Sequence, residues 1–321
     1  MRTLLAVAAM VAAVATAADA QAQGGYPAKP IRMLTPFSAG GGSDILARLI
    51  GPQITEAWGQ QIIVENRPGA AGNLGAGIVV KAEPDGYTLI IVSGTYGASG
   101  ALYKLPYDTV TAISPIILIG TTPLVLSVHP SLPVKDLKGF IALARSKPDA
   151  LSYGTAGLGD LAHLAGEMFK QQAKISMTQV PYKGSAPLMI GIVSGEVPVS
   201  ISSLVPTVPH VKAGRLRHIA VTTPGRSRAF PDVAAFAETV PGFDVTHWYG
   251  MWGPRGLPAD IVTRWNKEVA RIIRTEAIQK FFRTEGLEAA GGPPEEFRDR
   301  IRSDLEKWQK VVKEAKIVIG N

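Results

Sequence analysis

The chain has 321 residues, a formal net charge of +7, 46% apolar and 7% aromatic residues, and no cysteine. This length and apolar content suffice for two packed cores, and the lack of cysteine excludes a disulfide scaffold, a thiolate zinc site and cysteine catalysis. Lysine and arginine never form a run longer than two, so the positive charge is diffuse. Such a charge either attracts acidic solutes or only keeps the surface solvated, and we expect no nucleic-acid partner.

Residues 1–20 have the layout of a secretory signal peptide: Arg2, an apolar stretch at 4–14, and small residues ending in the sequence ADA. We expect cleavage near Ala20, with Ala22 as the alternative. A membrane anchor is the competing interpretation, but the apolar stretch is shorter than the roughly 20 residues that cross a bilayer. The mature protein is therefore expected in a bacterial periplasm.

Apolar runs typical of strands alternate with helical patterns along most of the chain. Strands are predicted at 30–35, 61–66, 87–92, 115–120, 123–128, 151–154, 177–181, 198–202 and 217–222. Helices are predicted at 43–58, 72–82, 135–147, 159–172, 185–195, 204–214, 259–275 and 294–315. This alternation is typical of parallel sheets covered on both faces, so the predicted fold class is α/β.

An internal repeat indicates two similar lobes. In the first half a strand leads into SAGGGSD, a helix and the strand QIIVEN, and in the second half a strand leads into GTAGLGD, a helix and the strand MTQV. Two matched βαβ units imply two lobes facing one cleft, although units of similar length also arise by chance. Proline-containing joins at 121–123 and 241–242 are the predicted lobe crossings, which form a hinge. The predicted lobes are residues 25–123 with 247–321, and residues 124–246.

The first glycine loop, residues 38–44, lies where a strand ends and a helix begins. Free N–H groups at a helix start carry partial positive charge, and glycine lacks the Cβ atom that would keep a ligand away. The loop can therefore hold an anion of carboxylate size without lysine. The alternative is a plain turn with Ser43 as the N-cap. Asp44 would repel an anion if it faced inward, and we expect it to pair with Arg48, four residues on.

The second glycine loop, residues 154–160, repeats this arrangement. Its segment GLGDLA also satisfies the dinucleotide-binding pattern G-x-G-x-x-G/A. That pattern expects an acidic residue about 20 positions on, and residues 174–183 contain none. We therefore predict no nicotinamide or flavin cofactor.

Motifs of catalysis are missing from the sequence. It contains no G-x-S-x-G, no phosphate loop of the type G-x-x-x-x-G-K-[ST] and no H-E-x-x-H. His163 and Glu167 can share a helical face but form an incomplete metal site, so no metal is predicted. Aromatic residues that can either line the cleft or belong to the core are Phe37, Tyr96, Tyr182, Trp248 and Trp252. Binding machinery is present, and catalytic machinery is not.

Several longer motifs occur in the order found in a known family. They are KPIRMLTPFSAGGGSDILARLIGPQI, IIVENRPGAAGNLGA, EPDGYTLIIVS, LSYGTAGLGDLAHLAGEMF, VPYKGSAP, VPHVKAGRLRHIAVT and WYGMWGPRGLPADIV. Over residues 26–315 the chain resembles the tripartite tricarboxylate transporter receptors, also called Bug solute-binding proteins. The resemblance implies a two-lobed periplasmic-binding-protein (Venus flytrap) fold, with a mostly parallel sheet in each lobe and a hinge of crossing strands.

The resemblance further implies a monomeric receptor rather than an enzyme. Such a receptor captures a small carboxylate-bearing organic acid between its lobes and delivers it to a membrane permease of the tripartite tricarboxylate type. Implied ligand contacts come from both glycine loops, the loop after the third strand, the turn before the helix at 185–195 and the strand at 198–202. The implied ligand-binding residues are Phe37, Ser38, Ala39, Gly40, Gly41, Ser43, Ser93, Thr95, Thr155, Gly157, Gly159, Lys183, Gly184, Ser185 and Ser202.

The chain departs from the family pattern at VPVSISS, where the family commonly has an acidic residue in a pattern like D-x-M-F-D. Ser202 and Ser203 occupy that place. This departure argues against an amino-acid ligand and for an anionic or neutral one. Two alternatives stay open, an exported enzyme on the same fold and a receptor that signals to a sensor kinase.

Overall fold

The structure is a computed structural model that describes residues 25–314 and residue 317. The predicted signal peptide, residues 1–20, lies outside the described residues. Within the described part of the chain, no helix is long and apolar enough to cross a bilayer.

The first lobe begins with three parallel strands in the order β2-β1-β3. These strands are β1 (Ile31–Thr35), β2 (Ile62–Asn66) and β3 (Thr88–Ser93). The helical segments that follow them are α2 (Gly42–Trp58), η1 (Ala70–Gly72), α3 (Asn73–Val80) and α4 (Thr95–Leu102). Because β1 and β3 end at the same edge of the sheet, the loops that follow them lie side by side.

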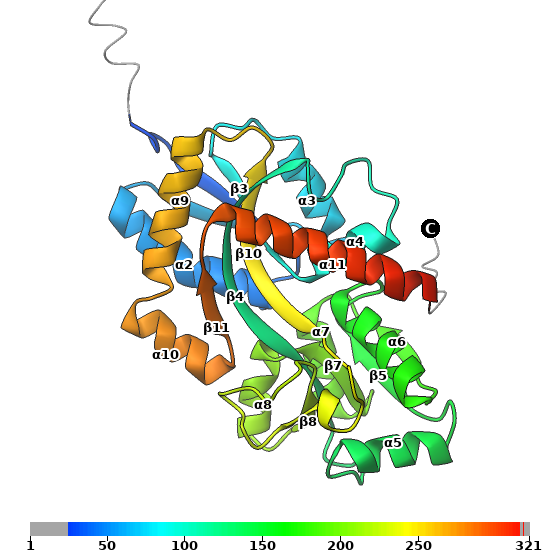
Figure 1. Cartoon of the computed structure of the whole chain (residues 1–321). Coiled ribbons are helices and arrows are strands. Elements are labelled where there is room, and N and C mark those ends of the chain that lie inside the picture. Colours follow the sequence, from blue (N-terminus) through cyan, green and yellow to red (C-terminus); the bar gives the residue numbers. More distant parts are fainter. Residues whose placement is uncertain (1–24, 315–316, 318–321) are drawn as a thin grey trace, which may run out of the picture.

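Two long strands cross between the lobes in opposite directions, and Figure 1 shows them curving side by side through the middle of the molecule. They are β4 (Ile113–Val128) and β10 (Thr246–Pro254). The sequence predicts separate strands at 115–120 and 123–128, and the structure joins them into one. Pro123 is tolerated inside β4 because the strand changes partners there, pairing with β10 up to Pro123 and with β7 from Leu124 on.

The second lobe surrounds the far half of β4, in the order β4-β7-β5-β6 with β8 and β9 on the other side of β4. Its strands are β5 (Ser152–Thr155), β6 (Thr178–Pro181), β7 (Val199–Ser203), β8 (Arg217–Val221) and β9 (Ala234–Ala235). Its helical segments are α5 (Leu137–Ser146), α6 (Leu161–Ala173), α7 (Ser185–Ser194), η2 (Val205–Thr207), α8 (Val208–Lys212) and η3 (Phe236–Glu238).

The chain then returns to the first lobe. The returning elements after β10 are α9 (Ala259–Ile272), α10 (Glu276–Glu285), β11 (Glu288–Gly291) and α11 (Pro294–Glu314). Helix α11 lies across α4 and reaches α6 of the second lobe (Figure 1). Its buried stripe of Phe297, Ile301 and Trp308 recurs at the spacing of one helical face. The C-terminal helix is therefore docked on both lobes.

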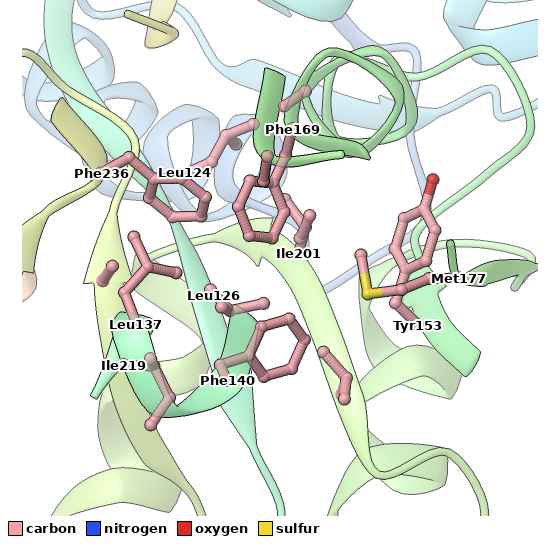
Figure 2. Packing of buried hydrophobic residues seen from close by; sticks show 14 of the residues in the cluster. Leu124, Leu126, Leu137, Phe140, Tyr153, Phe169, Met177, Ile201, Ile219 and Phe236 are labelled. Carbon is pink, nitrogen blue, oxygen red and sulfur yellow. The ribbon is translucent and has the colours of Figure 1, made fainter. Parts of the chain in front are cut away.

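Large apolar side chains fill a core in the second lobe, part of which Figure 2 shows. Phe169 lies edge-on to Phe236 with ring centroids 4.9 Å apart, and Phe140 packs beside Phe169. A separate cluster around Trp265 and Tyr249 fills the first lobe. Each fully buried side chain of this size contributes roughly 1.5–3 kcal/mol through removal from water, so each lobe has its own stabilising core.

The predicted α/β class and the two-lobed fold are confirmed. The sheet is mixed rather than mostly parallel: pairing is parallel within β2-β1-β3 and β7-β5-β6, and antiparallel wherever β4 or β10 takes part. The reason is that the crossing strands run in opposite directions between the lobes. The exact lobe boundaries stay predictions.

Candidate functional site

A cavity of about 470 Å³ lies between the lobes. Its walls come from the β1–α2 loop, the loop after β2 and the end of β3 in the first lobe, and from the β5–α6 loop, the β6–α7 turn and the end of β7 in the second lobe. β10 contributes the remaining wall. Most of these segments follow the carboxyl ends of parallel strands, where open α/β sheets bind ligands.

Eleven of the fifteen predicted ligand-binding residues line this cavity. They are Phe37, Ser38, Gly41, Ser43, Ser93, Thr95, Gly157, Lys183, Gly184, Ser185 and Ser202. The glycine loops of the two lobes thus face one cavity, as the internal repeat predicts. Of the candidate aromatic residues, Phe37 and Tyr182 line the cavity, whereas the other three are buried in the first lobe's core.

Four predicted residues do not line the cavity. The Gly40 N–H donates to Asp44 Oδ2 at 2.9 Å, and Gly40 with Ala39 lies exposed on the outside of the loop. Thr155 is fully buried, where its hydroxyl accepts from Gln179 at 2.8 Å. The Gly159 N–H donates to the ring of His163 at 3.2 Å. The polar groups of Gly40, Thr155 and Gly159 are thus engaged by other residues of the protein.

The first glycine loop leaves the start of α2 free of side-chain caps. Gly41 occupies the N-cap position without a side-chain hydrogen bond, and Ser43 lies within the first turn, so the predicted alternative of Ser43 as the N-cap is wrong. Asp44 forms the expected ion pair with Arg48 at 2.9 Å and also accepts from Asn66 at 3.0 Å. Asp44 is therefore held outside the cavity wall, and its charge does not block the helix start.

Three buried hydroxyl groups line the cavity, and we call them the hydroxyl cluster: Ser43, Ser202 and Tyr249. These side chains are 2%, 2% and 1% exposed, and none of the three hydroxyls has a hydrogen-bond partner among the described residues. A Cβ on Gly42 would lie 1.9 Å from Tyr249 Oη, so the glycine is what lets this hydroxyl approach the helix start. A buried polar group without a partner is costly, which indicates a ligand or water at this place.

The polar groups at this end are neutral. Burial raises the pKa of the Tyr249 hydroxyl to about 12. The nearby Ser203 opposes this rise, although the two side chains do not form a hydrogen bond. Burial, with a smaller effect of Arg300, lowers the pKa of His247 to about 3. Neutral donors at a helix start suit a carboxylate, because the helix supplies positive potential and the hydroxyls supply hydrogen bonds.

The second glycine loop differs, because its helix start is already occupied. Asp160 is the N-cap of α6 and accepts from the His163 N–H at 2.7 Å. The side chain is 7% exposed and lies in the cavity wall. Burial raises the pKa of Asp160 to about 7, against the opposing effect of backbone N–H groups around the carboxyl.

The two lobes touch across the mouth of the cavity. Ser38 Oγ donates to the Lys183 carbonyl at 3.4 Å, and Tyr103 Oη donates to the Leu158 carbonyl at 3.0 Å. Deeper in, the Leu161 N–H donates to Thr95 Oγ1 at 3.3 Å. These contacts hold the lobes closed on one another.

Several cavity residues escape the sequence analysis. The sequence marks Asp160 only as part of a glycine motif. Tyr103 directly follows α4, and His247 and Tyr249 belong to β10, two elements that the sequence does not predict. The loop at 68–72 also lines the cavity, and the sequence RPGAAG at 67–72 is the glycine-rich signal that points to it. In the described part of the chain, no three His, Asp or Glu side chains gather as metal ligands.

Two α/β lobes joined by crossing strands, with hydrogen-bond donors converging on the cavity between them, define a solute receptor. The sequence model described as tripartite tricarboxylate transporter family receptor (TctC) matches residues 46–317. The chain belongs to this family of periplasmic receptors.

The chain is also similar to proteins with solved structures and to named relatives. The structure described as R. palustris Rpa4515 with adipate is 36% identical with a TM-score of 0.88, and the match covers 92% of this chain and 99% of that one. MatC (Rpa3494) from Rhodopseudomonas palustris with bound malate is 31% identical with a TM-score of 0.84, covering 89% of this chain and 100% of that one. Protein BugT of Bordetella pertussis is 30% identical over 98% of both chains.

Proposed function

We propose that this protein is a periplasmic receptor that captures a small carboxylate-bearing organic acid between its lobes and delivers it to a membrane permease of the tripartite tricarboxylate type. The observation that carries this proposal is the uncapped start of α2 facing the hydroxyl cluster inside the cavity. A carboxylate placed there accepts from backbone N–H groups and from Ser43, Ser202 and Tyr249. The buried hydroxyls then gain the partners that they otherwise lack.

Capture is coupled to closure of the lobes. Ser43 belongs to the first lobe and Ser202 to the second, so one carboxylate contacts both only when the cleft is shut. The acid therefore binds the closed form better than the open form, and this difference shifts the population toward closure. The closed surface is what we propose the permease recognises.

The bound adipate and malate of two related receptors support the choice of ligand class. Both are small acids, and a cavity of about 470 Å³ has room for molecules of that size. The family membership supports the periplasmic location and the permease partner. We propose that the receptor acts as a monomer.

We further propose that the protein performs no catalysis. The titratable side chains in the cavity wall that an enzyme would use are Asp160, Lys183 and His247. In the described part of the chain, no hydrogen bond or ion pair joins any two of them. A nucleophile needs a base within hydrogen-bond reach, and the hydroxyls of Ser43, Ser202 and Tyr249 have no such partner among the described residues, so this arrangement supports binding.

A thermal-shift screen followed by calorimetry tests the proposal. The panel consists of adipate, malate, citrate and benzoate, with the corresponding neutral amides as controls. We expect at least one acid to raise the melting temperature, because a ligand that binds only the folded state stabilises it, while its amide does not. If no acid binds, or if the amides bind equally well, a carboxylate receptor is excluded.

A further inference from the structure

Asp160 is an acidic side chain in the wall of a cavity that we propose receives an acid. It is the N-cap of α6, accepts from the His163 N–H at 2.7 Å and is 7% exposed. Its neighbours Gly157, Leu158 and Leu161 line the same wall. A bound carboxylate and an ionised Asp160 would therefore share one enclosed space.

No cation offsets the charge of Asp160. Across residues 25–314, Asp160 forms no ion pair with any lysine, arginine or histidine. The titratable side chains that face it or share its cavity are Tyr103, Tyr153, Tyr182, Tyr249, His163, Lys183 and His247. Helix α11, which also packs on α6, supplies no residue to the cavity wall.

Most of these neighbours are neutral near pH 7. Burial raises the pKa values of Tyr103, Tyr153, Tyr182 and Tyr249 and lowers those of His163 and His247, so each of the six stays uncharged. Lys183 lies on the exposed turn at the cavity mouth, where solvent screens its charge. No cation therefore cancels the repulsion between a bound carboxylate and Asp160, which the backbone N–H groups around its carboxyl offset only in part.

We infer that Asp160 takes up a proton from solvent when the cleft captures its acid, so that the occupied receptor holds the carboxylate together with one added proton. This inference rests on the proposed function. Two carboxyl groups that share a site cannot both be ionised cheaply, and the usual outcome is one proton held on the pair. The protonated carboxyl also donates a hydrogen bond, which turns a repulsive neighbour of the ligand into an attractive one.

The sign of the pH effect follows from linkage. Burial places the pKa of Asp160 at about 7 in the unliganded cavity, and a bound negative charge raises it further. The bound state then holds more protons than the free state above pH 7, so affinity rises as pH falls. Between pH 8.5 and pH 6.5 this amounts to about a tenfold tightening, and at most to about twenty-five-fold.

Isothermal titration calorimetry at pH 6.5 and 8.5 tests the inference with the tightest acid of the panel of adipate, malate, citrate and benzoate. Each titration is run in two buffers of different ionisation enthalpy, which counts the protons taken up. For the unmodified protein we expect about tenfold tighter binding at pH 6.5, with proton uptake approaching one per acid at pH 8.5.

The informative variant is Asp160→Asn, which removes the charge and keeps a good N-cap acceptor for α6. We expect it to bind the acid with nearly the same affinity at both pH values and without the additional proton. Asp136→Asn is the matched control, because Asp136 is the N-cap of α5 and accepts from the Gly139 N–H at 2.7 Å, outside the cavity wall. It should behave as the unmodified protein.

Each remaining outcome is decisive. An acid that binds with equal affinity at both pH values overturns the inference and leaves the proposed function standing. An affinity that rises with pH also overturns it, since the ionised Asp160 would then accept a hydrogen bond from the ligand. If Asp160→Asn keeps the pH dependence, another group carries the proton. If no acid of the panel binds at either pH, the proposed function fails first and the inference with it.

Discussion

The two glycine loops look alike in sequence and differ in the structure. The β1–α2 loop leaves its helix start uncapped and places its acidic residue, Asp44, outside the cavity in a pair with Arg48. The β5–α6 loop places Asp160 on its helix start and in the cavity wall. Glycine spacing therefore indicates that a helix start faces a cleft, while the residue at the cap decides whether an anion can use it.

The largest expected effect concerns the cost of keeping Asp160 ionised. Its pKa rises from an ordinary 3.8 to about 7 through burial, so the folded state holds a proton that the unfolded state loses between these pH values. Stability must then fall as pH rises from about 4 to 7. We expect Asp160→Asn to gain stability relative to the unmodified protein by about 2–3 kcal/mol more at pH 8 than at pH 5.

Urea unfolding of both proteins at the two pH values measures this difference. Comparing the two proteins at each pH cancels the contribution of the other titrating groups, among them His218 and His247, whose pKa values burial lowers. If the free energies of unfolding of the two proteins differ by the same amount at both pH values, ionisation of Asp160 costs the fold no more than ionisation of the exposed Asp136.

The next effect tests whether the glycines of the two loops have different roles. A Cβ on Gly42 meets Tyr249 Oη at 1.9 Å and its ring carbon Cζ at 2.5 Å, so the tyrosine ring must shift to make room for it. We expect Gly42→Ala to weaken acid binding about a hundredfold and to destabilise the fold by about 1–3 kcal/mol through overpacking. Calorimetry and thermal unfolding measure both.

Gly157→Ala is the matched control in the second loop. A Cβ there has the Tyr182 carbonyl as its nearest neighbour, at an ordinary 3.9 Å. We expect less than a threefold loss of affinity. If the two substitutions weaken binding equally, the loops are equivalent in function, and the proposed difference in their roles is wrong.

A smaller effect is expected at the hydroxyl cluster. Ser202→Ala removes one neutral donor to the carboxylate, and we expect about tenfold weaker binding, which corresponds to about 1.4 kcal/mol. Ser200→Ala is the control, since Ser200 lies on the same strand, is equally buried and lacks a hydrogen-bond partner among the described residues, but does not line the cavity. Equal losses of affinity in both variants would exclude Ser202 as a ligand contact.

The smallest effect concerns the closed form. Tyr103→Phe removes the hydrogen bond to the Leu158 carbonyl across the cavity mouth. Because this bond is partly exposed, we expect only about a two- to fivefold weakening, seen mainly as faster dissociation. Tyr107→Phe, whose buried hydroxyl lies outside the cavity wall, should dissociate at the unmodified rate. Unchanged rates in both variants would show that this contact does not hold the lobes together.

Local sequence signals predict the fold and much of the cavity wall. The βαβ periodicity gives the elements of both lobes, and the glycines mark both loops because a strand, a turn and a helix are adjacent in the chain. Helices α4 and α10 and strand β10 escape such reasoning. Strand β10 carries Gly250 and Gly253 and is buried along nearly its whole length, so it lacks the alternation that marks a half-buried strand.

The missing part of the site comes from distant segments. Tyr249 reaches the start of α2 although about 200 residues separate it from Gly42, and no local pattern indicates that approach. The proton chemistry of Asp160 likewise depends on burial between the lobes rather than on neighbouring residues. Sequence spacing therefore identifies the loops, whereas the chemistry within the cavity needs the packed structure.

A crystal structure of the protein with the acid that binds most tightly would test most directly whether uncharged groups at the first glycine loop make the main contacts with the ligand. We predict carboxylate oxygens within hydrogen-bond distance of the Gly42 or Ser43 amide and of Ser202 or Tyr249. A carboxylate paired instead with the Lys183 ammonium at the cavity mouth, with the hydroxyl cluster left without a partner, would contradict the account.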